Sequence, residues 1–483
     1  MPDENRTEPT ATPSPPGREL RSTLTFLAVP ALFMLVILLT GIETPPALLY
    51  GVGAGCGVAL FVRSLSDPEW LMATTIVYMP LSKMFPASIA PLVNGMNMML
   101  VMLVVAWAAA ASRAGRKFFR PMPGTGFVTA WAAISCFSMI TAMITIGPDF
   151  ILSDELLEVK GWLDQFVIFY AFVNLIRDGR MAKRLVIYMI VGLAIVMVLG
   201  VQEMLQKQGL SNIEKSRVLG PQLQPNDFGA YLVYTIAPLL AYFLHHVYQL
   251  RTWLLAPVFG LTVKLLLVTF SRGAYIGFGL AGIAAAYVRG KLFLAFSALL
   301  LLGVLATFPE IIPDALMARI SSTSSDEGTG EQQLDRSSQT RVILWKAAVD
   351  MTLDYPLLGV GFKAFTVMKD QYTELPVRES DNHNMYLYIC SQMGIPALLV
   401  FLALIYRMYT MGATLYRQAE ERWTRVVALG APVMAAGVLG INMFGSRMIG
   451  VDVNGNFWVY FAILVHLWSE HQEQKEPKDR QPG

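Results

Sequence analysis

Three arginines in the sequence have side chains suited to binding an anionic ligand. Arg217 lies in a polar stretch, Arg272 opens an apolar segment, and Arg341 begins a helical pattern. A guanidinium group donates two parallel hydrogen bonds to anionic oxygens, so arginines gathered at one membrane face suit a phosphate or diphosphate. The alternative for each arginine alone is that it reaches out to lipid head groups. Considered together, the three favour an anion site.

His383 has the side chain best suited to accept a proton at neutral pH. It occurs in the sequence Asp381-Asn-His-Asn384, and of the five histidines it is the one that the topology below places on the outer side. A neutral imidazole there can take a proton from a hydroxyl group. The alternative is a histidine that caps a helix or lies at the interface. Residues expected to support the site are Lys83, Asn226, Tyr275, Trp345 and Asn384, and Arg447 in the last outer loop is a further candidate.

The acidic residues and cysteines do not form a pattern typical of a metal site. The outer loops contain no Asp-x-Asp or Glu-x-Asp pair, and no His/Cys cluster has metal-binding spacing. Cys56, Cys136 and Cys390 lie in or beside apolar segments and are interpreted as packing residues. The inner side has no Walker loop, which argues against ATP hydrolysis. We therefore expect metal-independent chemistry without a cofactor.

Composition and hydropathy predict an all-α integral membrane protein. Of 483 residues, 54% are hydrophobic and 15% charged, whereas soluble proteins average about 25% charged. Runs of roughly 20 apolar residues recur and predict a polytopic bundle of about 12–14 transmembrane helices. The expected spans are 24–41, 46–63, 69–82, 95–112, 126–147, 162–176, 185–203, 227–247, 252–270, 273–288, 292–309, 384–406, 425–444 and 454–469. Of these, 69–82 and 273–288 are short or polar and are candidates for broken segments.

The distribution of Lys and Arg predicts the orientation. Most of the 37 basic residues fall in alternate loops, which the positive-inside rule places in the cytoplasm together with both termini. The long loop then faces outward. The expected organisation is a disordered tail (1–21), a first part of the bundle (22–309), the large loop (310–382), a last part of the bundle (383–470) and a tail (471–483).

The two halves of the large loop differ in character. Residues 321–340 are rich in Ser, Gly, Gln and acidic residues and are expected to be mobile. From Arg341 onward the pattern predicts an amphipathic helix that is capped by Ser337 or Ser338 and ends at Pro356 and the turn Gly359-Val-Gly361. Its apolar face is expected to lie on the membrane or on the bundle.

The stretch from about residue 217 to residue 400 resembles the bacterial O-antigen ligase and O-antigen polymerase superfamily. The resemblance rests on the order and spacing of five pieces, namely Arg217-Val-Leu-Gly220 with Pro225-Asn226, Ser271-Arg272-Gly273, Arg341 to Trp345, the turn with Pro356, Gly359 and Gly361, and His383-Asn384 followed after ten residues by Gly394. One departure is Trp345, which stands where the family often has leucine.

This resemblance implies a glycosyltransferase of the bacterial inner membrane that works on the periplasmic face. The donor would be a glycan on undecaprenyl diphosphate, and the acceptor would be lipid A–core in a ligase or another lipid-linked repeat unit in a polymerase. His383 would be the general base, Arg217 and Arg272 would hold the diphosphate, and Arg341 would bind phosphate or orient the loop. The further expected partners are membrane lipids, and no nucleic acid is expected.

The alternative function class is a transporter or flippase for lipid-linked glycans. Such proteins favour inverted repeats and sites at the middle of the membrane. The sequence has no evident repeat, and its candidate residues gather on one outer face. This one-sided arrangement favours the enzyme.

Overall fold

The structure, a computed structural model, describes residues 46–85, 94–209, 213–307, 324–325, 333–334, 336–374, 377–379 and 381–475. The chain divides into two units, residues 1–63 and 64–483. In the first unit the described part belongs to α2 (Pro46–Ser66). Residues 1–21 and the expected span 24–41 lie outside the described residues. All that follows concerns the second unit.

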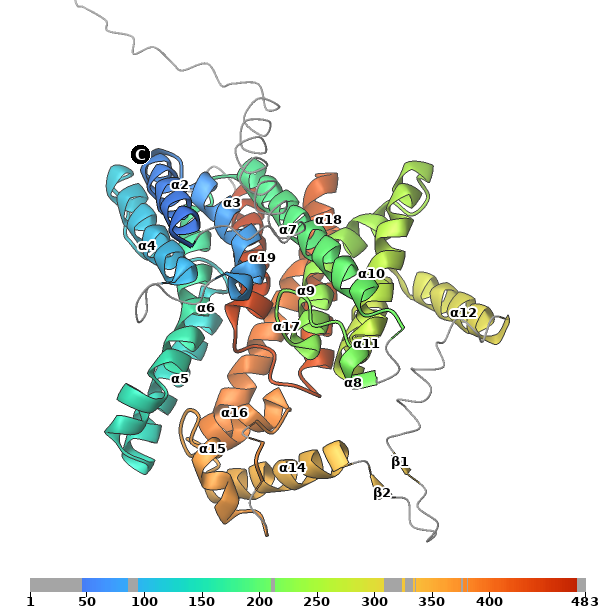
Figure 1. The fold of residues 1–483 in the computed structure, drawn as a ribbon. Coiled ribbons are helices and arrows are strands. Elements are labelled where there is room, and N and C mark those ends of the chain that lie inside the picture. Colours follow the sequence, from blue (N-terminus) through green and yellow to red (C-terminus); the bar gives the residue numbers. More distant parts are fainter. Residues whose placement is uncertain are drawn as a thin grey trace, which may run out of the picture. The chain divides into compact units, whose positions relative to one another are not determined.

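The second unit is built almost wholly of helices (Figure 1). They are α3 (Glu69–Tyr78), α4 (Gly95–Arg113), α5 (Thr125–Thr145), α6 (Leu156–Leu175), α7 (Gly179–Gln206), α8 (Ile213–Ser216), α9 (Pro225–His245), α10 (Ala256–Val268), α11 (Arg272–Arg289), α12 (Lys291–Thr307), α14 (Arg336–Asp354), α15 (Phe365–Met368), α16 (Met385–Met393), α17 (Ile395–Gln418), α18 (Arg422–Ile441) and α19 (Val451–Lys475). Two short strands, β1 (Ser324–Ser325) and β2 (Gln333–Leu334), pair antiparallel, with Ser324 opposite Leu334.

The predicted class, an all-α polytopic membrane fold, is confirmed. Within the described residues, seven helical stretches are long and apolar enough to cross a membrane. Of the two expected broken segments, 69–82 is indeed short, because α3 gives way to a 3-10 helix (Met79–Met84) that contains Pro80. The segment 273–288 instead lies within the continuous helix α11.

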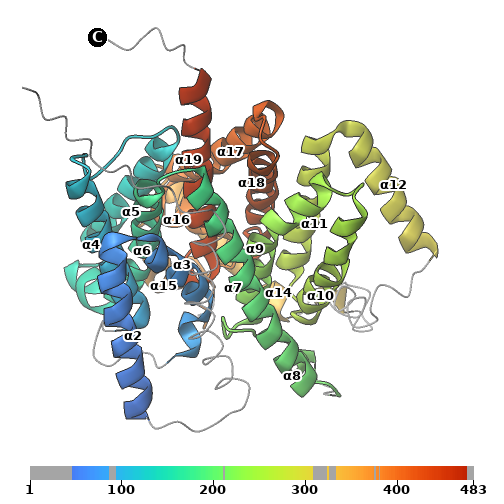
Figure 2. The ribbon, with the colours of Figure 1, turned by 90° about the horizontal axis from the view of Figure 1, so that it is seen from above.

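Helices α9, α18 and α19 lie together at the centre of this unit (Figure 2). From Val453 to Leu467, α19 is buried on all sides, as expected for a largely apolar helix at the centre of a bundle. Helix α5, by contrast, exposes Phe137, Ile140 and Ile144. In a membrane protein such exposed apolar faces meet lipid.

The expected single span 384–406 is wrong, because Gly394 divides it into α16 and α17. Asn384 caps the first of these helices, since its side chain accepts hydrogen bonds from the backbone N–H groups of Tyr386 and Leu387 (3.0 and 3.1 Å). Gly394 has φ of 86°, which ends α16 in a conformation that favours glycine. The ten residues between His383 and Gly394 therefore form the short helix α16 together with its N-cap, Asn384.

The amphipathic helix predicted in the second half of the large loop is α14, and it begins earlier than expected. Helix α14 begins at Arg336, so the expected caps at Ser337 or Ser338 are wrong and residues 336–340 belong to the helix. Figure 1 shows α14 beside α15 and α16 and crosswise to α17 and α18. The rest of the stretch expected to be mobile falls largely outside the described residues.

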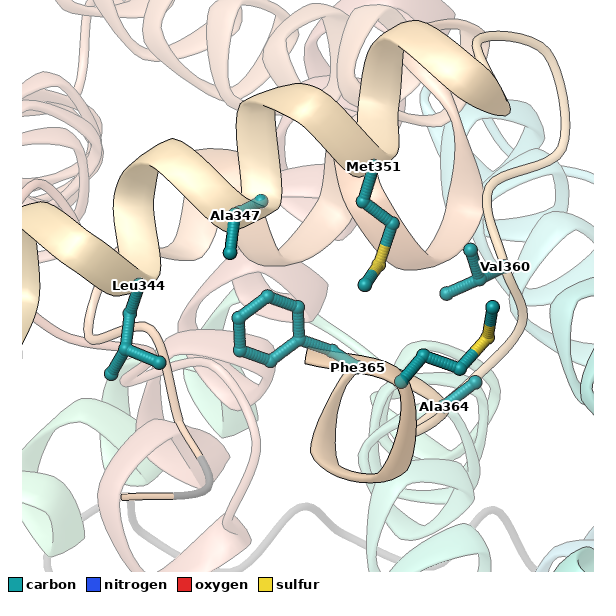
Figure 3. Close-up of a cluster of buried hydrophobic side chains, with 8 residues drawn as sticks. Leu344, Ala347, Met351, Val360, Ala364 and Phe365 are labelled. Atoms are coloured by element: carbon teal, nitrogen blue, oxygen red, sulfur yellow. The ribbon is translucent and has the colours of Figure 1, made fainter. Parts of the chain in front are cut away.

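The apolar face of α14 packs on the segment that follows it. Leu344, Ala347 and Met351 point toward Phe365, which comes from α15 (Figure 3). All four side chains are buried. The loop after α14 therefore has an apolar core of its own. The buried face of α14 was expected on the membrane or on the bundle, and it packs on this core of protein side chains and not on the membrane.

A glycine-rich turn joins this loop to the end of α16. The backbone N–H groups of Val360 and Gly361 donate to the carbonyl oxygens of Ser391 and Gln392 (2.9 and 3.0 Å). A Cβ atom on Gly359, whose φ is 64°, would lie 2.3 Å from the carbonyl carbon of Gln392. The expected end of the amphipathic helix at this turn is thus explained by close backbone packing.

Replacing Gly394 by alanine is expected to destabilise the junction. The new Cβ would lie 2.2 Å from the carbonyl oxygen of Leu357, on a residue with φ of 86°. The backbone strain alone costs about 1–3 kcal/mol. Thermal unfolding of the purified protein in detergent should show a lower Tm. The control is Gly279→Ala, where nothing lies within 4 Å of the added atom. A Tm for Gly394→Ala equal to that of the control would contradict this account.

Candidate functional site

Arg217 is held against the segment that leads into α11. Its Nε donates to the carbonyl oxygen of Thr269 (2.9 Å), and a terminal guanidinium nitrogen donates to Asn226 Oδ1 (3.0 Å). Thr269 lies three residues before Arg272. The structure therefore brings the segments of Arg217 and Arg272 together, and it gives Asn226 the task of orienting Arg217.

The loop around Arg217 is fixed from α7. The Glu203 carboxylate accepts hydrogen bonds from the backbone N–H groups of Leu219 and Gly220 (3.0 and 2.8 Å). Lys207 pairs with Glu203 (2.7 Å) and donates to the carbonyl oxygen of Arg217 (2.6 Å). Glu203 and Lys207 thus fix the backbone from Arg217 to Gly220.

Arg272 is the first residue of α11, after the N-cap Ser271. A cation at this end opposes the helix dipole, so helix stability does not explain an arginine here. An anion, however, would be attracted by both the arginine and the helix N-terminus. The Tyr275 hydroxyl donates to the carbonyl oxygen of Leu267 (2.7 Å), which holds the turn between α10 and α11.

His383 faces a carboxylate. Its Nδ1 lies 3.4 Å from Asp381 Oδ2, and the other carboxylate oxygen of Asp381 accepts a hydrogen bond from Ser446 Oγ (2.9 Å). Burial acts to raise the pKa of Asp381, but the neighbouring imidazole of His383, the charge of Arg447 and the hydrogen bond from Ser446 outweigh it and leave the pKa below its ordinary value. Asp381 is therefore ionised at neutral pH, and its carboxylate lies beside the imidazole.

Trp345 connects the helix that carries Arg341 to the segment of His383. Its indole N–H donates to the carbonyl oxygen of Asn382 (2.7 Å), and its ring lies 6.3 Å from that of Phe444. The residue that departs from the family pattern thus has a structural role one residue away from the histidine.

A cavity of about 390 Å³ opens beside Asp381. It is lined by Lys83, Leu157, Glu158, Gly161, Asp227, Lys363, Thr366, Asp381, Tyr388, Gln392, Ser446, Arg447, Ile449, Gly450, Asp452 and Val453. Lys83 pairs with Asp452 (2.8 Å), and Arg447 pairs with Asp227 (2.6 Å). Of the candidates from sequence, Lys83 and Arg447 meet here, whereas His383, Arg217, Arg272 and Arg341 do not line the cavity.

Several lining residues were missed from sequence. Asp227 and Asp452 stand at the first turns of α9 and α19, and acids at the ends of apolar segments are a signal that could have found them. Tyr388 and Gln392 are four residues apart on α16 and share a helix face. Nothing local distinguishes them from packing residues.

Backbone strain gathers in the same segments. Four residues other than glycine have positive φ within the described ranges, namely Leu223, Phe270, Lys363 and His383. They lie in the Arg217 loop, directly before Ser271, in the cavity wall and at the histidine itself. Such conformations cost about 1–3 kcal/mol each and typically occur at functional sites.

Residues 257–402 match the family model described as O-antigen ligase. The matched range contains Arg272, Arg341 and His383, while Arg217 precedes it. A comparison with curated proteins found no match. The family match confirms the predicted membership of the O-antigen ligase superfamily. Residues 257–402 are thus similar to a family of O-antigen ligases, and the helices of the described part fit a multi-pass bacterial membrane protein.

The carboxylate of Asp381 is expected to stabilise the fold in a pH-dependent way. Its pKa is depressed, so its contribution is present above the ordinary value of 3.8 and is lost as the pH falls through the lower folded value. Thermal unfolding should show a lower Tm for Asp381→Asn than for the wild type at neutral pH, and the difference should shrink below pH 3.8. Glu379→Gln, at an exposed neighbouring acid, is the control. A difference in Tm that does not change with pH would refute the assignment.

Proposed function

We propose that the protein transfers a saccharide from undecaprenyl diphosphate to a sugar hydroxyl at the periplasmic face of the bacterial inner membrane, without a metal ion. The observation that carries the proposal is His383 beside Asp381, a residue that lines the polar cavity. In this orientation the large loop is periplasmic and both termini are cytoplasmic, as the distribution of basic residues predicts.

His383 acts as the general base. Asp381 favours the tautomer with the proton on Nδ1, so Nε2 is free to accept the proton of the acceptor hydroxyl. The acceptor oxygen then forms a bond to the anomeric carbon of the donor, and the bond from that carbon to the phosphate oxygen breaks. A positioned base of this kind contributes about 10²–10⁴-fold to the rate.

The arginines act on the leaving group. Undecaprenyl diphosphate departs with the bonding electrons, and negative charge builds on its oxygens as it leaves. Arg217 and Arg272 are held on neighbouring segments, and an anion between them also meets the N-terminus of α11. Such preorganised donors stabilise the charge in the role that a metal ion has elsewhere. Arg341, on α14, is proposed to bind phosphate or to orient the loop.

The acceptor distinguishes a ligase from a polymerase, and a deletion strain separates the two. Loss of glycan on lipid A–core while polymer is still made indicates a ligase. Loss of long polymer indicates a polymerase. The same strain provides the background for testing variants.

His383→Ala is expected to abolish transfer. The variant removes the proton acceptor, so the strain that carries it should make no more product than the deletion strain, while the protein still accumulates in the membrane. Product is measured by gel analysis of the extracted glycolipids, and accumulation is measured by immunoblotting. The control is His246→Ala, at the far end of α9. Near-normal product in His383→Ala would sink the general-base role.

Arg272→Lys is expected to lower transfer by at least about tenfold, because a lysine keeps the charge but loses the bidentate geometry. Arg289→Lys makes the same change at the other end of α11 and should be close to wild type. Rates are compared in membranes at equal protein levels. Equal activity of the two variants would mean that Arg272 only reaches toward lipid head groups.

A further inference from the structure

The charges that line the cavity are already neutralised by one another. Each cation pairs with an acid that also lines the cavity: Lys83 with Asp452 (2.8 Å), Arg447 with Asp227 (2.6 Å) and Lys363 with Glu158 (3.1 Å). Asp381 faces His383. A diphosphate in this cavity would have to break one of these pairs to gain a cation and would meet carboxylates as it did so. The cavity therefore disfavours an anion.

Two buried polar atoms at the cavity have no partner. The Tyr388 hydroxyl and the Gln392 Oε1 atom make no hydrogen bond within the described structure, although their residues are only 4% and 1% exposed. An unsatisfied buried polar group costs about 1–3 kcal/mol. Both residues line the cavity, so a ligand with hydroxyl groups would satisfy both atoms.

These two residues lie on the helix that follows the histidine. Helix α16 begins two residues after His383, and Tyr388 and Gln392 follow on one face of it. The ring of Trp162 stacks on that of Tyr388, with centroids 6.1 Å apart and an angle of 20°. The hydroxyl of Tyr388 is thus fixed relative to the base.

We infer that the cavity is the binding site for the acceptor saccharide, and that Tyr388 and Gln392 recognise it as a neutral, hydroxyl-rich ligand. The diphosphate of the donor binds outside this cavity, on the side of Arg217 and Arg272. The identification of this saccharide as the acceptor rests on the proposed transferase function. The volume of about 390 Å³ lies in the range of small-ligand pockets, roughly 300–1,000 Å³.

The test is direct binding to the purified full-length protein in detergent. The probes are neutral di- and trisaccharides of glucose, galactose, mannose and N-acetylglucosamine, with binding measured by saturation-transfer NMR. At least one probe should bind the wild type, and Tyr388→Phe or Gln392→Met should weaken its binding by about tenfold or more, as expected for the loss of one buried hydrogen bond. Tyr372→Phe is the matched control, because its hydroxyl bonds to Asp354 outside the cavity. Thermal unfolding checks that each variant is folded.

Inorganic pyrophosphate provides the second measurement. It should not displace the bound saccharide from the wild type. The inference is overturned if no saccharide binds, if binding is unchanged in both variants, or if pyrophosphate competes with it. Transfer in membranes is measured in parallel, so the two proposals fail separately. Saccharide binding as expected with full transfer by His383→Ala would refute the proposed catalysis and leave the binding site in place.

Discussion

The buried amide of Asn442, at the end of α18, holds the parts of the site in register. Its side-chain NH₂ donates to the Tyr234 hydroxyl of α9 (3.0 Å), and its Oδ1 accepts from the backbone N–H of Arg447 (2.9 Å). The backbone carbonyl oxygen of Asn442 accepts a hydrogen bond from the backbone N–H of Met385, the first residue of α16 (3.0 Å). Asn442 is fully buried, so each of these bonds would be costly to leave unmade. One residue therefore fixes the start of α16, and with it His383, relative to α9 and α18.

A series of polar contacts near this junction connects the loop of Arg217 with the segment of His383. Asn226 orients Arg217, its neighbour Asp227 pairs with Arg447, and Ser446 binds Asp381 beside the histidine. Such contacts are strong where water is excluded, and they restrict how the segments move relative to one another. The arrangement suits a reaction with two lipid-borne substrates. In the proposed reaction, the unpaired polar groups would bind the saccharide acceptor and the arginines would bind the anionic leaving group on another side.

Hydropathy and spacing predicted the helical fold well, since apolar segments of spanning length have few alternatives in lipid. The errors came where distant contacts decide. The break at Gly394 is fixed by the backbone of Leu357, and no local pattern in 384–406 reveals that contact. The start of α14 at Arg336 likewise precedes the expected cap. Serines are common at such caps, but Ser337 and Ser338 lie within the first turn of the helix.

The sequence by itself determined the membrane class, and its motifs selected His383, Arg217, Arg272 and Arg341, because side-chain chemistry and charge bias are local properties. Only the tertiary structure decided which of these residues meet. The pairing of Asp227 with Arg447 joins residues 220 positions apart, and the unpartnered atoms of Tyr388 and Gln392 are defined by what surrounds them. Partnership and burial are properties of packing between helices, so sequence reasoning found the histidine but not the cavity beside Asp381.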